Sequence, residues 1–391
     1  MASGTNPGGA ETSAPDAGAV PGAGARPAAE AAAGAGGGSG RAGRAVTPAS
    51  EAQREAWRSG ALPEVERVRP GLWSIPVPLP IPLRYVLVYA LELPGGVALV
   101  DAGWNTDEAY GALAAGLRTA GYEMTDVEAV LVTHIHPDHY GLAGRVREVS
   151  GAWIGLHPAD AALIHGRYDP EAVDALVERE RLLLERSGVP EATVEELAGA
   201  SMMIRQFVSM AGPDRLIEDG DRLDLPGWDL HAIWTPGHSP GHLCFAERER
   251  RLLFSGDHVL AKITPIVAVH PQSTPDPLAD YLDSLAAVGK LDVDEVLPAH
   301  EYRFLELAER VDRVVAHHAA RLAEIEAVVG GAGGISCWET ATRLTWSRPW
   351  ETIPAHMRRA ATNETLAHLV WLEERGRLRR SAGAPDLWHP A

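Results

Sequence analysis

Short apolar runs alternate with amphipathic stretches between residues 53 and 302. The runs are rich in Val, Leu and Ile and too short for helices, so they predict buried strands, with helices between them. Strands are expected near Trp153 and at residues 85–93, 97–101, 129–132, 230–234, 242–246, 252–254 and 295–297. The turn sequence Pro94-Gly95-Gly96 predicts that the first two form a hairpin. This alternation is typical of an α/β layered domain.

Residues 159–215 interrupt that pattern with helical periodicity. Apolar side chains recur at helical spacing from Val173 to Leu184, and Gly188 with Pro190 predicts the end of that helix. A second helix is expected to carry Val194, Leu197, Met202, Met203, Phe207 and Val208. Such a face is typical of packing on the core. The alternative is a lid over a site, because Met and Phe side chains adapt to varied apolar ligands.

The chain after residue 302 is predicted to be helical. A long amphipathic helix is expected at residues 304–329, and the run Gly330-Gly-Ala-Gly-Gly334 ends it. Two shorter helices are expected around residues 338–344 and 354–374, followed by Gly376 and a short strand. Residues 303–391 are therefore expected to form a small winged-helix-like region.

The stretch at residues 1–52 is mostly Gly and Ala with scattered Pro, and the charges of its first fifty residues cancel. A segment without large apolar side chains cannot offset its ordering entropy by burial, so we expect a disordered tail. The sequence shows neither the apolar run of a secretory signal nor the roughly twenty apolar residues of a membrane-spanning helix. A cytoplasmic protein without a membrane partner is therefore expected.

The charge balance limits the partners of the folded part. Lys and Arg number 35 and Asp and Glu number 53, so the formal net charge is −18, which disfavours nucleic acid as a partner. The two cysteines, Cys244 and Cys337, lie far apart and form no CxxC motif, so neither a disulfide framework nor a cysteine metal site is predicted. Cys244 is interpreted as a core residue.

A dense group of imidazole and carboxylate side chains follows one of the predicted strands. The sequence THIHPDH occupies residues 133–139, and neutral imidazole and carboxylate are preferred ligands of divalent metals. His134 and His136 are two positions apart, so in extended chain they face the same way. Asp138 and His139 follow a proline, where the chain is expected to turn, and can point at a second ion.

Further ligand types follow other predicted strands. The sequence TPGHSPGH contains His238, and its glycines allow a tight turn that points this imidazole inward. The sequence SGDH contains Asp257, whose two oxygens can bridge a pair of cations, and LPAH contains His300.

This series of motifs resembles the metallo-β-lactamase superfamily over roughly residues 70–302. The resemblance implies an α/β fold, a four-layer αββα sandwich at residues 53–302, here with a helical insertion and a small helical C-terminal domain. It implies that His134, His136 and His238 hold one metal. It also implies that Asp138, His139 and His300 hold a second, with Asp257 as the bridge between them.

Three more residues are expected to stand behind these ligands. His242 and His258 lie beside ligand positions, but in each case the family takes its metal ligand from the neighbouring position. A supporting or structural role is therefore favoured for both histidines. Asp101 resembles the family's aspartate that steadies the site, with packing into the turn at Gly103 as the alternative. Tyr140 is expected to pack, and the alternative is a hydroxyl offered to an oxyanion.

Two divalent cations would lower the pKa of a shared water towards about 7 and polarise the bond under attack, which predicts hydrolysis. Asp138 is the catalytic candidate that orients the nucleophile and carries a proton to the leaving group. Zinc is favoured, because the family's diiron branch replaces the second His of the motif by Glu and this chain has His136. Iron and manganese are the alternatives.

The preferred hypothesis is that the substrate is a small or medium thioester, ester or lactone of acyl type. One alternative is a single-strand nuclease whose basic patch would contain Arg358, Arg359, Arg375, Arg377, Arg379 and Arg380. Another is an iron-dependent persulfide dioxygenase. The sequence leaves the oligomeric state open.

Overall fold

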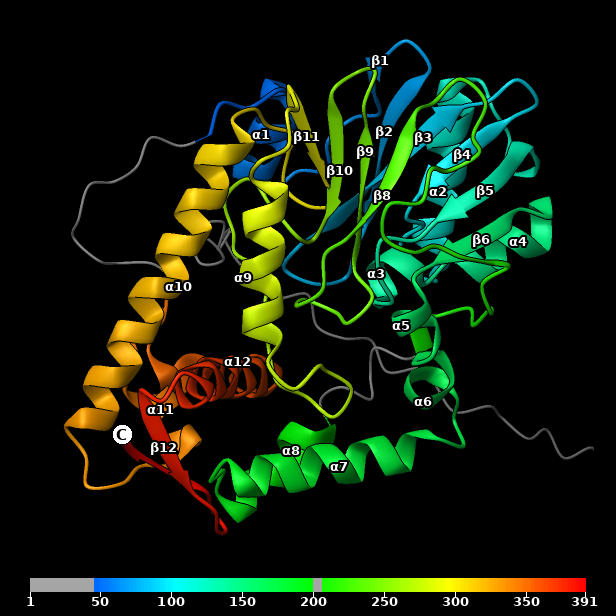
Figure 1. Cartoon of the computed structure of the whole chain (residues 1–391). Helices are drawn as coiled ribbons and strands as arrows, with labels where there is room; N and C mark the ends of the chain where they lie inside the picture. Colours follow the sequence, from blue (N-terminus) through cyan, green and yellow to red (C-terminus); the bar gives the residue numbers. More distant parts are fainter. Residues whose placement is uncertain (1–45, 200–205) are drawn as a thin grey trace, which may run out of the picture.

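The protein is described by a computed structural model that covers residues 46–199 and 206–391, in which two β-sheets pack face to face (Figure 1). The larger sheet has the spatial order β1 (Glu66–Arg69), β2 (Leu72–Pro78), β3 (Tyr85–Glu92), β4 (Val97–Val100), β5 (Val127–Leu131), β6 (Trp153–Leu156) and β7 (Arg215–Leu216). The smaller has the order β11 (Glu295–Pro298), β10 (Leu252–Gly256), β9 (Leu243–Glu247) and β8 (Leu230–Trp234). The strands expected from sequence are therefore confirmed.

Strand direction changes within each sheet. Neighbours from β1 to β4 are antiparallel, and those from β4 to β7 are parallel. In the smaller sheet β8, β9 and β10 are antiparallel, whereas β10 and β11 are parallel. The expected hairpin forms, with Glu92 opposite Val97.

Helices cover the outer faces of both sheets (Figure 1). The larger sheet packs against α2 (Asp107–Ala120) and α4 (Ala143–Ser150), and the smaller one against α9 (Pro277–Val288) and α10 (Leu307–Gly330). The result is the expected four-layer αββα sandwich. Single-turn 3-10 helices occur at η1 (Met124–Asp126) and η3 (Trp350–Thr352).

Burial of both sheet faces explains the nearly continuous apolar sequence of β3. Tyr85, Leu87 and Tyr89 point into the core between the sheets, whereas Val86 and Val88 point into the core beneath α2. All five are essentially inaccessible to solvent.

The ordered fold begins before the expected domain boundary at residue 53. Residues 1–45 of the expected tail lie outside the described residues, but α1 (Glu51–Ser59) starts within it. The Ser50 side chain caps this helix by accepting a hydrogen bond from the Gln53 backbone N–H at 3.2 Å. Pro48 forms a bridge with Phe304, so residues 46–52 are part of the folded unit.

The insertion is helical, as expected, and contains α5 (Pro158–Ala161), α6 (Ile164–Tyr168), α7 (Val173–Arg186) and α8 (Glu191–Gly199). Met202 and Met203 lie outside the described residues. The expectation that Phe207 and Val208 share the helix of Val194 is wrong, because Phe207 lies in a 3-10 turn and Val208 in no helix. Phe207 instead stacks on Trp104, with ring centroids 4.5 Å apart.

The C-terminal region contains α11 (Cys337–Arg343), α12 (Ala355–Glu374) and the antiparallel hairpin of β12 (Leu378–Ser381) and β13 (Leu387–Pro390). It gathers with α7 and α8 at one end of the molecule (Figure 1). The buried Glu180 of α7 accepts hydrogen bonds from Arg359 at 3.2 Å and from Asn363 at 2.9 Å, both on α12. The insertion is thus fixed to the C-terminal helices.

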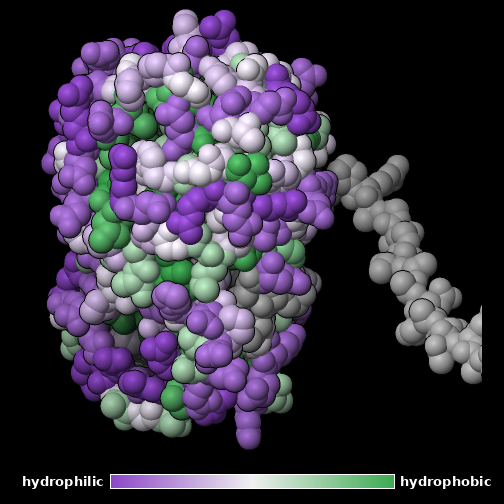
Figure 2. Space-filling model, turned by 90° about the vertical axis from the view of Figure 1, so that its right-hand side faces the viewer, coloured by the Kyte–Doolittle hydropathy of each residue, from purple (hydrophilic) through white to green (hydrophobic). Residues whose placement is uncertain are grey.

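The surface is predominantly polar, with apolar side chains in scattered spots on the face shown in Figure 2. Across the described part of the chain, no helix combines the length and apolar character needed to cross a membrane.

Replacement of Trp388 tests whether the C-terminal region and the sandwich share one core. Trp388 of β13 is 1% exposed and belongs to the same apolar cluster as Tyr89 and Phe254 between the sheets. Trp388→Ala is expected to lower the free energy of unfolding by about 3–5 kcal/mol, because it leaves a large cavity. Denaturant unfolding should remain a single transition by both fluorescence and circular dichroism. The exposed Met357→Ala on α12 serves as control, and separate transitions for the two regions would contradict a shared core.

A buried histidine pair predicts acid sensitivity. His318 Nδ1 lies 3.1 Å from His368 Nε2, and burial lowers the pKa of His368 to about 4. In the unfolded chain His368 binds a proton below about pH 6.5, whereas in the folded protein it stays neutral down to about pH 4. Its contribution to the free energy of unfolding is therefore complete above about pH 6.5 and is lost as the pH falls towards 4. It amounts to roughly 3 kcal/mol. The free energy of unfolding of His368→Gln should depend less steeply on pH across this window, and identical slopes would contradict the assignment.

Candidate metal centre

All seven residues expected to be ligands meet at one edge of the sandwich. His134, His136, Asp138 and His139 follow β5 and lead into α3 (Pro137–Tyr140). The others follow strands of the smaller sheet: His238 lies between β8 and β9, Asp257 follows β10 and His300 follows β11. The site therefore joins the two sheets.

One group consists of three imidazoles. His134 Nε2 lies 2.9 Å from His136 Nδ1, and His238 Nε2 lies 3.0 Å from the same atom. These three residues offer nitrogen atoms close enough to hold a single ion. His136 and His238 are only partly buried, so this side of the site is the more accessible to solvent.

The second group contains Asp138, His139 and His300. His300 Nε2 lies 3.3 Å and His139 Nε2 lies 3.7 Å from Asp138 Oδ2. Asp257 stands between the two groups. Its Oδ2 lies 3.6 Å from His238 Nε2, whereas its Oδ1 lies 3.6 Å from His139 Nε2 and 3.4 Å from His300 Nε2.

Hydrogen bonds behind the imidazoles fix which ring nitrogen faces the centre. His139 Nδ1 lies 2.8 Å from Asp101 Oδ2, His300 Nδ1 lies 2.9 Å from Tyr85 O and His238 Nδ1 lies 2.8 Å from Ile266 O. In each case the proton on Nδ1 leaves the Nε2 lone pair directed at the centre. Asp101 adopts a left-handed backbone with φ of +63° and also accepts from the Thr133 backbone N–H at 2.8 Å.

His242 and His258 lie behind the centre in different ways. His242 Nε2 accepts a hydrogen bond from the Asp257 backbone N–H at 3.2 Å, and its Nδ1 lies 2.8 Å from Thr235 Oγ1. The His258 ring packs edge-on against Tyr281 and lies against the backbone of Ser284. His242 therefore supports the loop that carries Asp257, whereas His258 serves as a packed ring.

Burial and neighbouring charges divide the imidazoles into two classes. Burial, together with the adjacent imidazoles, lowers the pKa of His134 and His136 well below the ordinary value, so both are neutral donors of a lone pair. Burial opposes protonation of His139 as well, but Asp101, Asp138 and Asp257 together raise the pKa of His139 well above the ordinary value. This half of the centre attracts positive charge.

The residues present fit a bound cation. His139 Nε2, His300 Nε2 and Asp257 Oδ1 are buried and have no hydrogen-bond partner among the described residues. Such atoms are costly to bury unless something pairs with them. Ligand atoms around a tetrahedral ion with bonds of ~2.0–2.1 Å lie about 3.3 Å apart, close to the separations found in both groups.

Asp160 on α5 belongs to the site and was not predicted from sequence. It is fully buried and accepts hydrogen bonds from the Ile135 backbone N–H at 2.9 Å, Ser239 Oγ at 2.9 Å and the Gly241 backbone N–H at 2.7 Å. It thus joins the segment of His134 and His136 to the loop of His238. The signal available in the sequence was the dipeptide Pro158-Ala159 after a strand, which opens a helix but says nothing of its contacts.

The expected tight turn at Gly237 is confirmed. Its φ is +132°, and a Cβ atom there would lie 2.4 Å from the Tyr281 Cβ. Only glycine lets the loop approach α9 this closely and direct His238 inward.

Two residues near the motifs contribute to packing. The Tyr140 hydroxyl accepts a hydrogen bond from the Ala211 backbone N–H at 2.7 Å, so it is occupied away from the centre. Cys244 is fully buried in the core between the sheets, where burial raises the pKa of its thiol to about 12.

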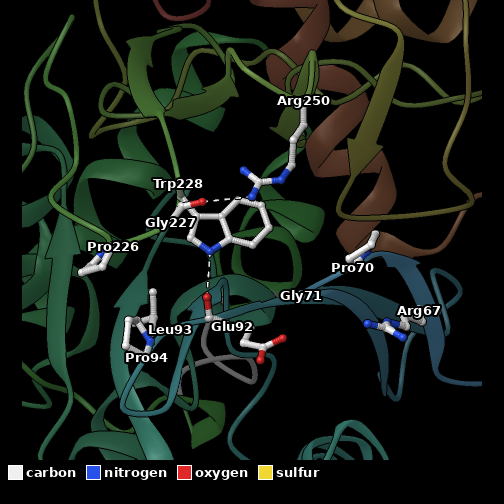
Figure 3. A pocket seen from close by; sticks show the side chains of 10 residues that line it. All are labelled: Arg67, Pro70, Gly71, Glu92, Leu93, Pro94, Pro226, Gly227, Trp228 and Arg250. Carbon is white, nitrogen blue, oxygen red and sulfur yellow. Dashed lines mark hydrogen bonds between the residues drawn. The ribbon is translucent and has the colours of Figure 1, made fainter.

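A surface hollow of about 360 Å³ lies at the β1–β2 and β3–β4 turns (Figure 3). Gly71 and Pro94 line it from the β1–β2 and β3–β4 turns, and Arg250 lies over the Trp228 ring at 4.1 Å. Trp228 Nε1 donates to Glu92 O at 2.9 Å, so its polar atom is already paired. None of the candidate ligands lines this hollow.

The comparisons with known proteins agree with this geometry. The family model described as "Metallo-beta-lactamase superfamily" matches residues 81–300. A Bacillus subtilis (strain 168) protein named "Probable metallo-hydrolase YqjP" is 31% identical over 243 residues, which cover 58% of this chain and 70% of that protein. A Gallus gallus protein named "Acyl-coenzyme A thioesterase MBLAC2" is 31% identical over 196 residues, 49% of this chain and 62% of that protein.

Two solved structures share the fold. A metallo-beta-lactamase family protein from Thermus thermophilus has a TM-score of 0.71 and 34% identity, with coverage of 83% of this chain and 100% of that one. A beta-lactamase domain protein from Burkholderia ambifaria has a TM-score of 0.72 and 25% identity, with coverage of 84% and 94%. Since the family model matches more than half of the chain, and sequence relatives, fold and candidate metal-binding groups agree with it, the protein belongs to the metallo-beta-lactamase superfamily.

Proposed function

We propose that the protein is a hydrolase that uses two divalent metal ions, zinc by preference, to cleave a small or medium acyl thioester, ester or lactone. The observation that carries this proposal is the position of Asp257. One of its oxygens faces the group of His134, His136 and His238, and the other faces the group of Asp138, His139 and His300. A carboxylate placed in this way suits two ions rather than one.

Two ions held there would supply Lewis acidity for the scissile carbonyl and a water of lowered pKa. The chain's own contribution is acid–base chemistry at Asp138. Burial opposes its ionisation, but His139 and His300 lower the pKa of Asp138 below the ordinary value, so it is a carboxylate at neutral pH. It is 8% exposed at the edge of the centre, where it can accept a proton from the attacking water and return it to the leaving group.

The acyl substrate class is supported by the comparisons. The relative named an acyl-coenzyme A thioesterase shares 31% identity with this chain over 196 residues. For this protein we propose only the same class of bond, an activated acyl ester with a thiol or alcohol as leaving group.

The nuclease alternative receives less support. Arg359, Arg375 and Arg377 of its basic patch form ion pairs with Glu180, Asp276 and Glu326, and Arg380 pairs with Glu373. Most of the patch is therefore neutralised, and phosphate backbones would meet a strongly acidic protein. The persulfide dioxygenase alternative requires iron, which metal analysis of the purified protein distinguishes from zinc.

Asp257→Asn is expected to lose at least one metal equivalent and to lower kcat for thioester hydrolysis at least about 100-fold, because the carboxylate between the two groups becomes a neutral amide with a single oxygen. Metal content by mass spectrometry and hydrolysis by a thiol-trapping dye give the two readings. His258→Phe is the matched control at the adjacent position and should retain its full metal content, because His258 belongs to none of the candidate metal-holding groups among the described residues. Metal loss in the control would instead assign His258 a ligand role.

Asp160→Ala is expected to weaken metal binding 10–100-fold while the fold persists, because the segments of His136 and His238 lose their common anchor. Each backbone N–H left unpaired should also cost about 1–3 kcal/mol of unfolding free energy. Chelator competition measures the affinity and denaturant titration the stability. Asp160→Asn retains an acceptor oxygen, so its metal affinity and stability should lie between those of the native protein and Asp160→Ala. A stable Asp160→Ala with unchanged metal affinity would refute the anchoring role.

A further inference from the structure

Arg167, on α6, is a half-buried cation that lies within electrostatic reach of the buried Asp160 but forms no direct ion pair among the described residues. No carboxylate among residues 46–199 and 206–391 forms an ion pair with it, and its Nη1 donates to Gln272 Oε1 at 3.3 Å. Arg359, the nearby arginine of α12, shows the usual arrangement, because its charge is compensated by Glu180. In a chain with a net charge of −18, a guanidinium left without such a partner calls for an explanation.

Arg167 is held close to the candidate metal centre. The hydroxyl of the next residue, Tyr168, donates to Ile135 O at 2.6 Å, and Ile135 separates two of the imidazoles of the first group. The backbone next to Arg167 is therefore tied to the segment that carries His134 and His136. In Figure 1, α6 lies beside α5 on the side of the molecule that carries α3.

The segment opposite Arg167 also borders the centre. Ile266 O accepts the hydrogen bond that orients His238, at 2.8 Å, and His270 and Gln272 follow within six residues. Both His270 and Gln272 are half-buried. Arg167 and these two residues therefore belong to segments that are each hydrogen-bonded to a ligand-bearing part of the chain.

The spare polar groups of this cluster are donors. His270 Nδ1 accepts from the Gln272 backbone N–H at 3.2 Å, so the neutral ring carries its proton on Nε2. The Gln272 side-chain oxygen accepts from Arg167, which leaves its amide NH2 as a donor. A guanidinium, an imidazole N–H and an amide NH2 together match the oxygens of a carboxylate or a phosphate.

We propose that Arg167, with His270 and Gln272, binds an anionic group of the substrate, so that the preferred acyl substrates of this protein are negatively charged. This inference rests on the proposed acyl hydrolysis. The anion would be a carboxylate on the acyl chain or a phosphate on the thiol half, two sources of the same oxygen chemistry.

Three thioesters distinguish these sources on the metal-loaded full chain. Acetyl-N-acetylcysteamine is uncharged, succinyl-N-acetylcysteamine carries a carboxylate on the acyl side, and acetyl-phosphopantetheine carries a phosphate on the thiol side. We expect one charged substrate to exceed the neutral one at least tenfold in kcat/KM. In Arg167→Gln that ratio should fall at least tenfold, chiefly through KM, and Arg167→Lys should restore part of it. Arg58→Gln, on α1 and paired with Glu55 at 3.1 Å, is the matched control.

A second measurement separates this inference from the proposed function. Succinate or inorganic phosphate should raise the melting temperature of the protein, and Arg167→Gln should abolish that shift while Arg58→Gln keeps it. Hydrolysis of all three thioesters with equal kcat/KM, or an anion shift that persists in Arg167→Gln, would overturn the inference and leave the proposed function standing. An Arg167-dependent shift without hydrolysis of any thioester would support the anion site and overturn the proposed function.

Discussion

Buried negative charge at the edge shared by the two sheets is the constraint on which the rest of this structure depends. Asp101, Asp138 and Asp257 are each at most 8% exposed and all lie against the imidazole of His139. Burying carboxylates so close together is unfavourable unless positive charge compensates them. Two features hold the carboxylates and imidazoles in this arrangement. They are the left-handed backbone at Asp101 and the carboxylate of Asp160, which anchors the ligand segments.

The layered architecture and the gathering of the candidate ligands at one edge could be predicted because both leave local signatures. Apolar runs mark strands buried on two faces, and each ligand follows such a run. The strand β2 was missed because Pro76 and Pro78 weaken its signal; the structure tolerates them because β1 pairs only with Leu72 to Ser74, so both prolines lack a partner strand on that side. Asp160 was missed for a different reason, since its role exists only through contacts with residues 25 to 81 positions away.

The insertion and the C-terminal region are best understood together. Each is a set of short amphipathic helices that cannot bury its apolar face alone, and Leu184, Leu197 and Trp338 form a small core between them. Because the two regions pack against each other, the periodicity of apolar residues could predict the helices of both regions but not which surfaces those helices cover. The alternative interpretation of the insertion as a lid gains no support from α7, which is fixed to α12 through Glu180.

The candidate ligands are scattered from His134 to His300, on segments that follow four strands of two different sheets. A peptide containing any one motif would therefore lack the centre, and so would a folding intermediate in which only one sheet had formed. Because these segments come together only when both sheets are in place, the candidate site is complete only in the folded chain. Any metal that the site holds then stabilises the native state alone, which makes metal supply in the cell a determinant of how much protein survives as well as of how much is active.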